Sequence, residues 1–136
     1  MTTPPRVLFV CVKNGGKSQM AAGLMSDLAG DTIDVVSAGT QPGTSLNQLS
    51  VQSLDELGID ISHGTPKPVN DAELEAADIV ITLGREATVE VPAGTELENW
   101  DTDEPSERGI EGIERMRLVR DDIRRRVEKL HSRLMS

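Results

Sequence analysis

Four short runs of apolar and β-branched residues are spaced along the chain. Residues 7–10 and 78–83 are almost entirely apolar, which is typical of strands that are buried on both faces of a sheet. Residues 33–36 form a second such run, and residues 95–100 form another before the C-terminal third of the sequence. The pattern therefore predicts four strands.

Between these runs the apolar residues recur at helical spacing. This periodicity predicts helices over about residues 19–30, 45–57 and 110–135, with a shorter helix over 71–77. Alternating strands and helices indicate an α/β fold, a three-layer doubly wound sheet of about four parallel strands with helices on both faces. We expect one domain, residues 1–136, with its ligand site at the carboxyl ends of the strands.

A glycine-containing loop at the end of the first strand carries the candidate chemistry. Cys11 ends the strand, Gly15 and Gly16 follow, and a helix begins directly afterwards. Backbone N–H groups in such a loop, together with the helix N-terminus, form an anion-binding nest that also favours the thiolate form of a cysteine. Lys17 supplies a positive charge, and the Ser18 hydroxyl can donate to the sulfur. The residues that we expect to hold an oxyanion over Cys11 are Val12, Lys13, Asn14, Gly15, Gly16, Lys17 and Ser18.

Composition narrows the function further. A net charge of −9 argues against a nucleic-acid partner, and no apolar run is long enough to span a membrane. The N-terminus lacks the apolar segment of a signal peptide, so we expect a cytoplasmic protein. With one cysteine and two scattered histidines, we expect no disulfide and no metal site. One Phe, one Trp and no Tyr provide little aromatic surface to hold a phosphotyrosine ring.

The spacing C-x5-K-S resembles the C-x5-R-S phosphate loop of low-molecular-weight protein tyrosine phosphatases and of the arsenate reductases built on that fold. The resemblance makes Cys11 the nucleophile, Asn14 the residue that braces the loop and Ser18 the support of the thiolate. Lys17 stands where the family has arginine. The segment 14–22 is most similar to the mycothiol-dependent arsenate reductases of actinobacteria. Segments 37–40, 57–63 and 100–105 also resemble family motifs in the same order.

The segment 100–105 implies the position of a catalytic acid. In the family the aspartate immediately before a proline protonates the departing oxygen. Glu104 holds that position here, one methylene longer than aspartate, and Asp103 precedes it. We therefore expect Glu104 to be the general acid, with Asp103 as the second choice.

The missing cysteines distinguish between mechanisms. Thioredoxin-coupled relatives carry two further cysteines, whereas Cys11 has no such companions in this sequence. The resemblance therefore implies an arsenate reductase that transfers arsenate to a small thiol, mycothiol as co-substrate, with a glutaredoxin-like redoxin (mycoredoxin) releasing arsenite and no bound cofactor. One alternative is a phosphomonoesterase that uses Cys11 as nucleophile. Another is a non-catalytic protein that binds arsenate or phosphate, which the departures at Lys17 and Glu104 keep open.

Overall fold

The computed structural model describes residues 3–136, so that residues 1 and 2 of the predicted domain lie outside the described part. Four parallel strands form one sheet in the order β2-β1-β3-β4. Their bounds are Arg6–Cys11 (β1), Asp34–Gly39 (β2), Ile79–Leu83 (β3) and Glu96–Trp100 (β4). The predicted sheet of four parallel strands is confirmed.

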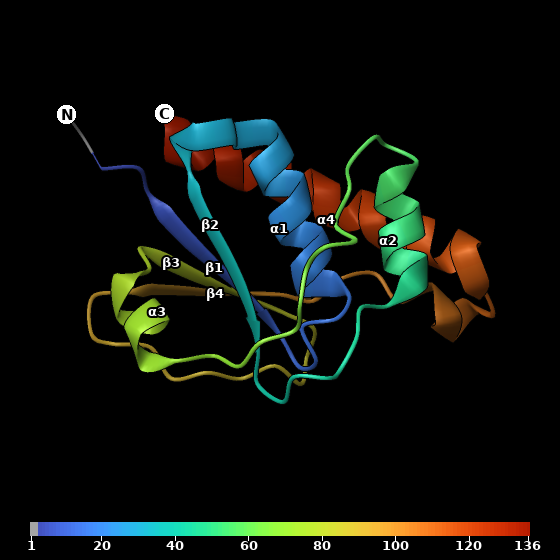
Figure 1. Cartoon of the computed structure of the whole chain (residues 1–136), viewed down its shortest axis with the longest axis horizontal. Helices are drawn as coiled ribbons and strands as arrows, with labels where there is room; N and C mark the ends of the chain where they lie inside the picture. The colour runs from blue at the N-terminus through green and yellow to red at the C-terminus, as the bar shows by residue number, and fades with distance from the viewer. Residues whose placement is uncertain (1–2) are drawn as a thin grey trace.

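Helices cover both faces of the sheet, as predicted (Figure 1). The helices α1, α2 and α4 gather on one side, and the shorter α3 lies on the other. Their bounds are Lys17–Ala29 (α1), Gln48–Asp55 (α2), Asp71–Ala76 (α3) and Gly112–Met135 (α4), with 3-10 turns at Gly30–Thr32 (η1) and Pro105–Arg108 (η2).

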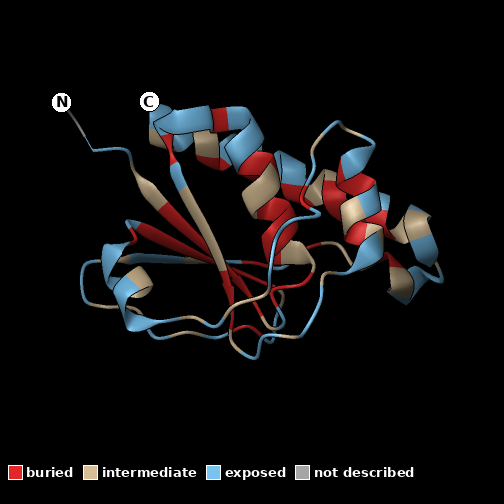
Figure 2. Ribbon diagram, viewed as in Figure 1, coloured by how far each residue is buried: buried red, intermediate tan, exposed pale blue. Residues whose placement is uncertain are grey.

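The central strand β1 divides the core into two halves. Val7 and Phe9 face the larger apolar cluster under α1 and α4, whereas Leu8 and Val10 face a smaller cluster on the α3 side. This alternation follows from the period of two in a strand, and it explains why the run is apolar at every position. The buried residues concentrate along β1, β3 and the inward sides of the helices (Figure 2).

Two element boundaries differ from the sequence-based prediction in ways that matter for the site. The first helix begins at Lys17 rather than near residue 19, which places Lys17 and Ser18 in its first turn. The second helix is shorter than 45–57 because Asn47 caps it, its side chain accepting a hydrogen bond from the N–H of Ser50. The irregular segment before Asn47 lies against the loop after β1.

The long helix α4 is held to α2 by a buried guanidinium. Arg120 donates to the Ser53 carbonyl at 2.9 Å and to the Glu56 carboxylate at 2.9 Å. This anchor fixes the start of α4 beside the carboxyl ends of the strands. Within residues 3–136, no helix combines the length and apolar character needed to cross a membrane.

Candidate active site

Cys11 lies at the carboxyl end of β1, the strand that has β2 on one side and β3 on the other. Such a switch point is the standard ligand position in open α/β sheets. The residue is 7% exposed, and it lines a cavity of about 620 Å³. The structure therefore places the only thiol of these 136 residues at the base of a cavity.

Two hydrogen bonds converge on the sulfur. The Asn14 N–H donates to Cys11 Sγ at 3.1 Å, and Ser18 Oγ lies 2.9 Å from the same sulfur. Asn14 Nδ2 donates to Ser18 Oγ at 2.7 Å, so the serine oxygen is an acceptor there and its own proton is available to the sulfur. Donors directed at sulfur favour the thiolate, which is the nucleophilic form.

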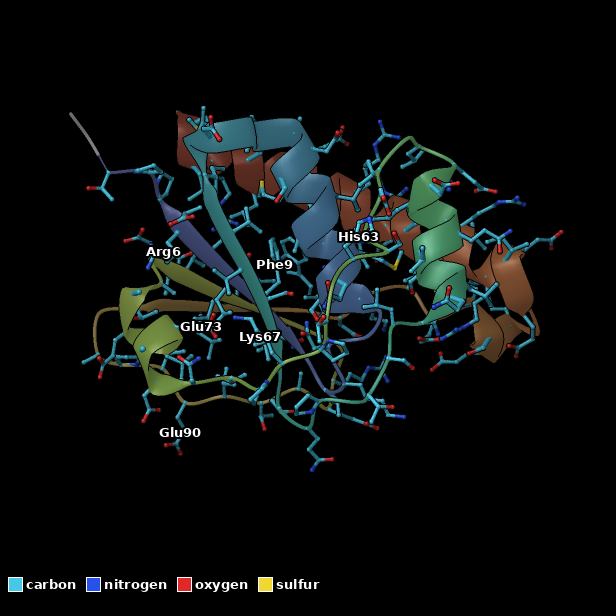
Figure 3. The ribbon with its side chains drawn as sticks, in the orientation of Figure 1. Arg6, Phe9, His63, Lys67, Glu73 and Glu90 are labelled. Atoms are coloured by element: carbon cyan, nitrogen blue, oxygen red, sulfur yellow. The ribbon has the colours of Figure 1, made fainter. Side chains whose placement is uncertain are left out.

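Asn14 is the brace of the loop. Its backbone is left-handed, with φ at 53°, an arrangement that asparagine tolerates better than most residues. Its side-chain oxygen accepts from the Lys67 N–H at 3.0 Å and from Gln19 Nε2 at 3.3 Å, which fixes the orientation of the amide. The Lys67 side chain pairs with Glu73 on α3, so this brace also ties the loop to the opposite layer (Figure 3).

The carbonyl groups of the loop point outward. Those of Cys11, Val12, Lys13 and Gly15 accept hydrogen bonds from backbone N–H groups of the segment 40–47, at 2.6 to 3.0 Å. The Asn14 carbonyl accepts from Gln19 Nε2 at 3.1 Å, and the Gly16 carbonyl from Met20 N–H at 2.9 Å. With its acceptors occupied on the outside, the loop offers N–H groups to an anion at its centre. This arrangement suits an anion-binding nest, and the binding of an oxyanion by these residues stays a prediction.

Gly39, at the end of β2, allows the backbone of residues 12–14 to approach β2 closely. A Cβ at that position would lie 2.7 Å from the Val12 carbonyl oxygen and 3.0 Å from the Asn14 nitrogen, both backbone atoms that cannot yield easily. Gly15 is restricted in the same way, since a Cβ there would lie 2.9 Å from the Ser45 carbonyl oxygen.

The segment 100–105, here called the acid loop, meets residues 11–18, here called the oxyanion loop, through an ion pair. Lys17 Nζ lies 3.4 Å from Glu104 Oε1, and Arg115 of α4 donates to both oxygens of the same carboxylate at 3.0 Å. Burial alone raises the pKa of Glu104, but hydrogen bonds from Arg115 and Ser106 and the charge of Lys17 bring that pKa below its ordinary value. Glu104 is therefore a carboxylate at neutral pH in the free protein. Two cations hold it ionised, so its role as general acid, which stays a prediction, requires that it first takes up a proton.

Asp103 lies on the same cavity and is held apart from the loop. Arg108 binds its two oxygens at 2.9 and 3.1 Å, and this pairing lowers the pKa of Asp103. The structure thus brings Cys11, Lys17, Asp103 and Glu104 to one cavity.

The predicted and observed site residues differ in part. Val12 lines the cavity, whereas the side chain of Lys13 is exposed and takes no part in the lining. Gln19 and Arg115 were missed by the sequence reasoning. Gln19 carried a signal, because it directly follows the loop, but Arg115 is one of several arginines on a polar helix. Within residues 3–136, no group of three or more His, Cys, Asp or Glu side chains is arranged to hold a metal ion.

A family profile described as low molecular weight phosphotyrosine protein phosphatase matches residues 6–136. The chain belongs to this family. This chain is 38% identical over 129 residues to a provisional arsenate reductase of Halobacterium salinarum, and the match covers 90% of this chain and 87% of that protein.

Solved structures of the family agree with this assignment. A thioredoxin-dependent arsenate reductase of Corynebacterium glutamicum matches with a TM-score of 0.83 and 32% identity over 99% of this chain. The present chain spans 64% of the length of that protein. An arsenate reductase in the phosphate-binding state matches with a TM-score of 0.81 and 30% identity, covering 96% of this chain and 98% of the other.

Proposed function

We propose that this protein is an arsenate reductase that transfers arsenate from the oxyanion loop (residues 11–18) to a small thiol. The observation that carries the proposal is the sulfur of Cys11, which receives the Asn14 N–H and faces the Ser18 hydroxyl beneath a nest of backbone N–H groups. Its family relatives named above are arsenate reductases, which supports arsenate as the oxyanion. The phosphate-bound relative further supports an oxyanion in the loop.

The nature of the cavity favours arsenate transfer over hydrolysis of a phosphotyrosine. No aromatic side chain is among the residues that line the cavity of the described chain, so an aryl ring would find no stacking partner there. Lys17 also lacks the planar fork with which arginine binds two phosphoryl oxygens at once. Both features weaken the phosphomonoesterase alternative.

These 136 residues contain one cysteine, Cys11, and in the proposed reaction a small thiol supplies the second sulfur. The cavity of about 620 Å³ is in the range that suits an organic ligand rather than an oxyanion alone. Its lining holds five carboxylates and three cations, so it offers many hydrogen-bond acceptors and a net negative charge. These properties suit an uncharged thiol rich in hydroxyl groups, and mycothiol, a thiol on a sugar–inositol scaffold, is our candidate.

The roles of the residues follow from their positions. Cys11 is the nucleophile toward arsenic, Lys17 and the loop N–H groups neutralise the oxyanion, and Ser18 supports the thiolate. Glu104 lies 3.4 Å from Lys17 of the loop and handles the proton, with Asp103, which pairs with Arg108, as the second choice. A glutaredoxin-like redoxin then attacks the thiol sulfur of the arsenic adduct, and arsenic leaves as arsenite with the electron pair of the As–S bond.

The experiment compares thiols. Purified protein is supplied with arsenate and either mycothiol or glutathione, each with its matching redoxin, and arsenite is quantified. We expect turnover with mycothiol, much less with the negatively charged glutathione, and none for Cys11→Ser. Glu107→Gln and Glu86→Gln remove lining carboxylates that do not contact the oxyanion loop, and they should raise the KM for mycothiol without affecting arsenate binding. Arsenite formation by Cys11→Ser at the wild-type rate would exclude the proposed mechanism.

A further inference from the structure

Arg115 reaches the active site from outside the loops that form it. It lies in the first turns of α4, and its guanidinium donates to Glu104 Oε1 and Oε2, each at 3.0 Å. The side chains of Arg115 and Glu104 are 28% and 31% exposed, so this pair is partly withdrawn from water. Such pairs are less weakened by solvent than those on the open surface.

Glu104 is held from three elements at once. Lys17 approaches from α1 at 3.4 Å, Ser106 of η2 donates its hydroxyl at 2.9 Å, and Arg115 approaches from α4. The neighbouring carboxylate of Asp103 is neutralised separately by Arg108. Glu104 is thus the point at which the oxyanion loop, the acid loop and α4 meet.

We propose that Arg115 is a positioning residue for the thiol-transfer reaction, holding Glu104 over the oxyanion loop while Lys17 turns to the bound oxyanion. This inference rests on the proposed function. Lys17 cannot serve both partners fully, because an arsenate in the loop competes with Glu104 for its ammonium group. Arg115 has no such competing ligand in the loop, and it keeps Glu104 in place through the cycle.

The anchored carboxylate has a defined task when the thiol arrives. The thiol S–H bond breaks and its proton passes to Glu104, while the thiol sulfur bonds to arsenic. The bond between arsenic and Cys11 Sγ breaks, and the thiolate of Cys11 is restored. Arsenic stays pentavalent in this step, and charge is conserved because the proton that leaves the thiol remains on Glu104. Glu104 then releases this proton to solvent and returns to the carboxylate form of the free protein.

Removing Arg115 should change the pH dependence as well as the rate. Burial by itself raises the pKa of Glu104, whereas Arg115, Ser106 and Lys17 lower it. Without Arg115 the pKa of Glu104 is lowered less, so Glu104 loses its negative charge at a higher pH than in the wild type. In Arg115→Gln we expect kcat/KM for the thiol to fall roughly fivefold at about pH 5, with a smaller loss toward pH 8. Arg115→Lys, which keeps the charge, should recover part of the acid-side activity.

The matched control is Arg117→Gln. Arg117 is on the same helix, two residues away, and also pairs with a glutamate, but its partner is Glu56, which is not among the residues that line the cavity. Arg117→Gln should leave the pH profile unchanged. A loss in Arg115→Gln that is the same at every pH, or that persists unchanged when Glu104→Gln is already present, would overturn the inference.

The two proposals fail differently. If the wild-type protein makes no arsenite with any thiol, the proposed function fails. If the wild-type protein is active and Arg115→Gln retains its rate and its pH profile, the positioning role of Arg115 is wrong while the proposed function stands.

Discussion

Replacing Asn14 with alanine tests the construction of the oxyanion loop most sharply. The change removes three side-chain hydrogen bonds, to Ser18 Oγ, from the Lys67 N–H and from Gln19 Nε2. Each contributes on the order of 1 kcal/mol net, and the Lys67 N–H is left without this acceptor, whereas Gln19 Nε2 still donates to the backbone carbonyl of residue 14. The left-handed backbone at φ 53° adds roughly 1 kcal/mol of strain for a residue with a plain Cβ.

The sum is a loss of about 4 kcal/mol in the free energy of unfolding, a large part of the roughly 5–15 kcal/mol that a domain has. For a chain of this size, the melting temperature should fall by roughly 10–15 °C. Urea unfolding followed by circular dichroism measures the free energy, and calorimetry measures the melting temperature. Phosphate added to the wild type should raise the melting temperature, and this protection should be lost in Asn14→Ala because the loop no longer holds its shape.

Asn14→Gly separates the two contributions. Glycine relieves the left-handed strain but makes none of the side-chain hydrogen bonds, so it should be roughly 0.5–1 kcal/mol more stable than the alanine variant. A loss below about 1 kcal/mol in Asn14→Ala, or full phosphate protection in both variants, would refute the view that this residue braces the loop.

Three further outcomes follow from the contacts. Gly39→Ala should displace the loop backbone at Asn14 and abolish oxyanion binding even where the protein remains folded, as read by phosphate titration followed by NMR. Ser18→Ala should slow the alkylation of Cys11 by iodoacetamide at neutral pH, because one hydrogen-bond donor to the sulfur is lost. Hydrogen bonds and charge from Arg117, and then from Arg120, lower the pKa of Glu56 to about 2, so the stabilisation from these pairs is complete above about pH 4.5 and disappears as the pH falls toward 2. Acid titration of the melting temperature should therefore be flatter in Arg117→Gln than in the wild type.

The sheet could be predicted from the sequence because the residues of its central strands do not also fit the pattern of an amphipathic helix. The apolar run of β1 has no polar position that a helix could expose, and β3 is similar. The start of α1 was placed late because Gly16 provides no side-chain cap, and a helix that begins at an anion site keeps its first N–H groups for the ligand. Local signals could not show this.

The site was predictable where its residues are close in sequence. Cys11, Lys17 and Ser18 belong to one loop, and their neighbourhood follows from spacing alone. The state of Glu104 was not predictable, because it depends on Arg115, which is 11 residues away on a helix whose other arginines pair elsewhere. Lys67 was equally hidden, since it acts on Asn14 through its backbone N–H and not through its side chain.

The most direct test of the central claim measures the arsenite that the purified protein forms from arsenate with three mixtures: mycothiol with mycoredoxin, mycoredoxin alone, and thioredoxin with its reductase. A fourth reaction replaces arsenate with an aryl phosphate and measures its hydrolysis. The account predicts arsenite only when mycothiol and mycoredoxin are both present, and no appreciable hydrolysis of the aryl phosphate. Arsenite formed with thioredoxin alone would contradict the transfer to a small thiol. Ready hydrolysis of the aryl phosphate, lost in Cys11→Ser, with no arsenite in any mixture, would contradict the arsenate reductase itself.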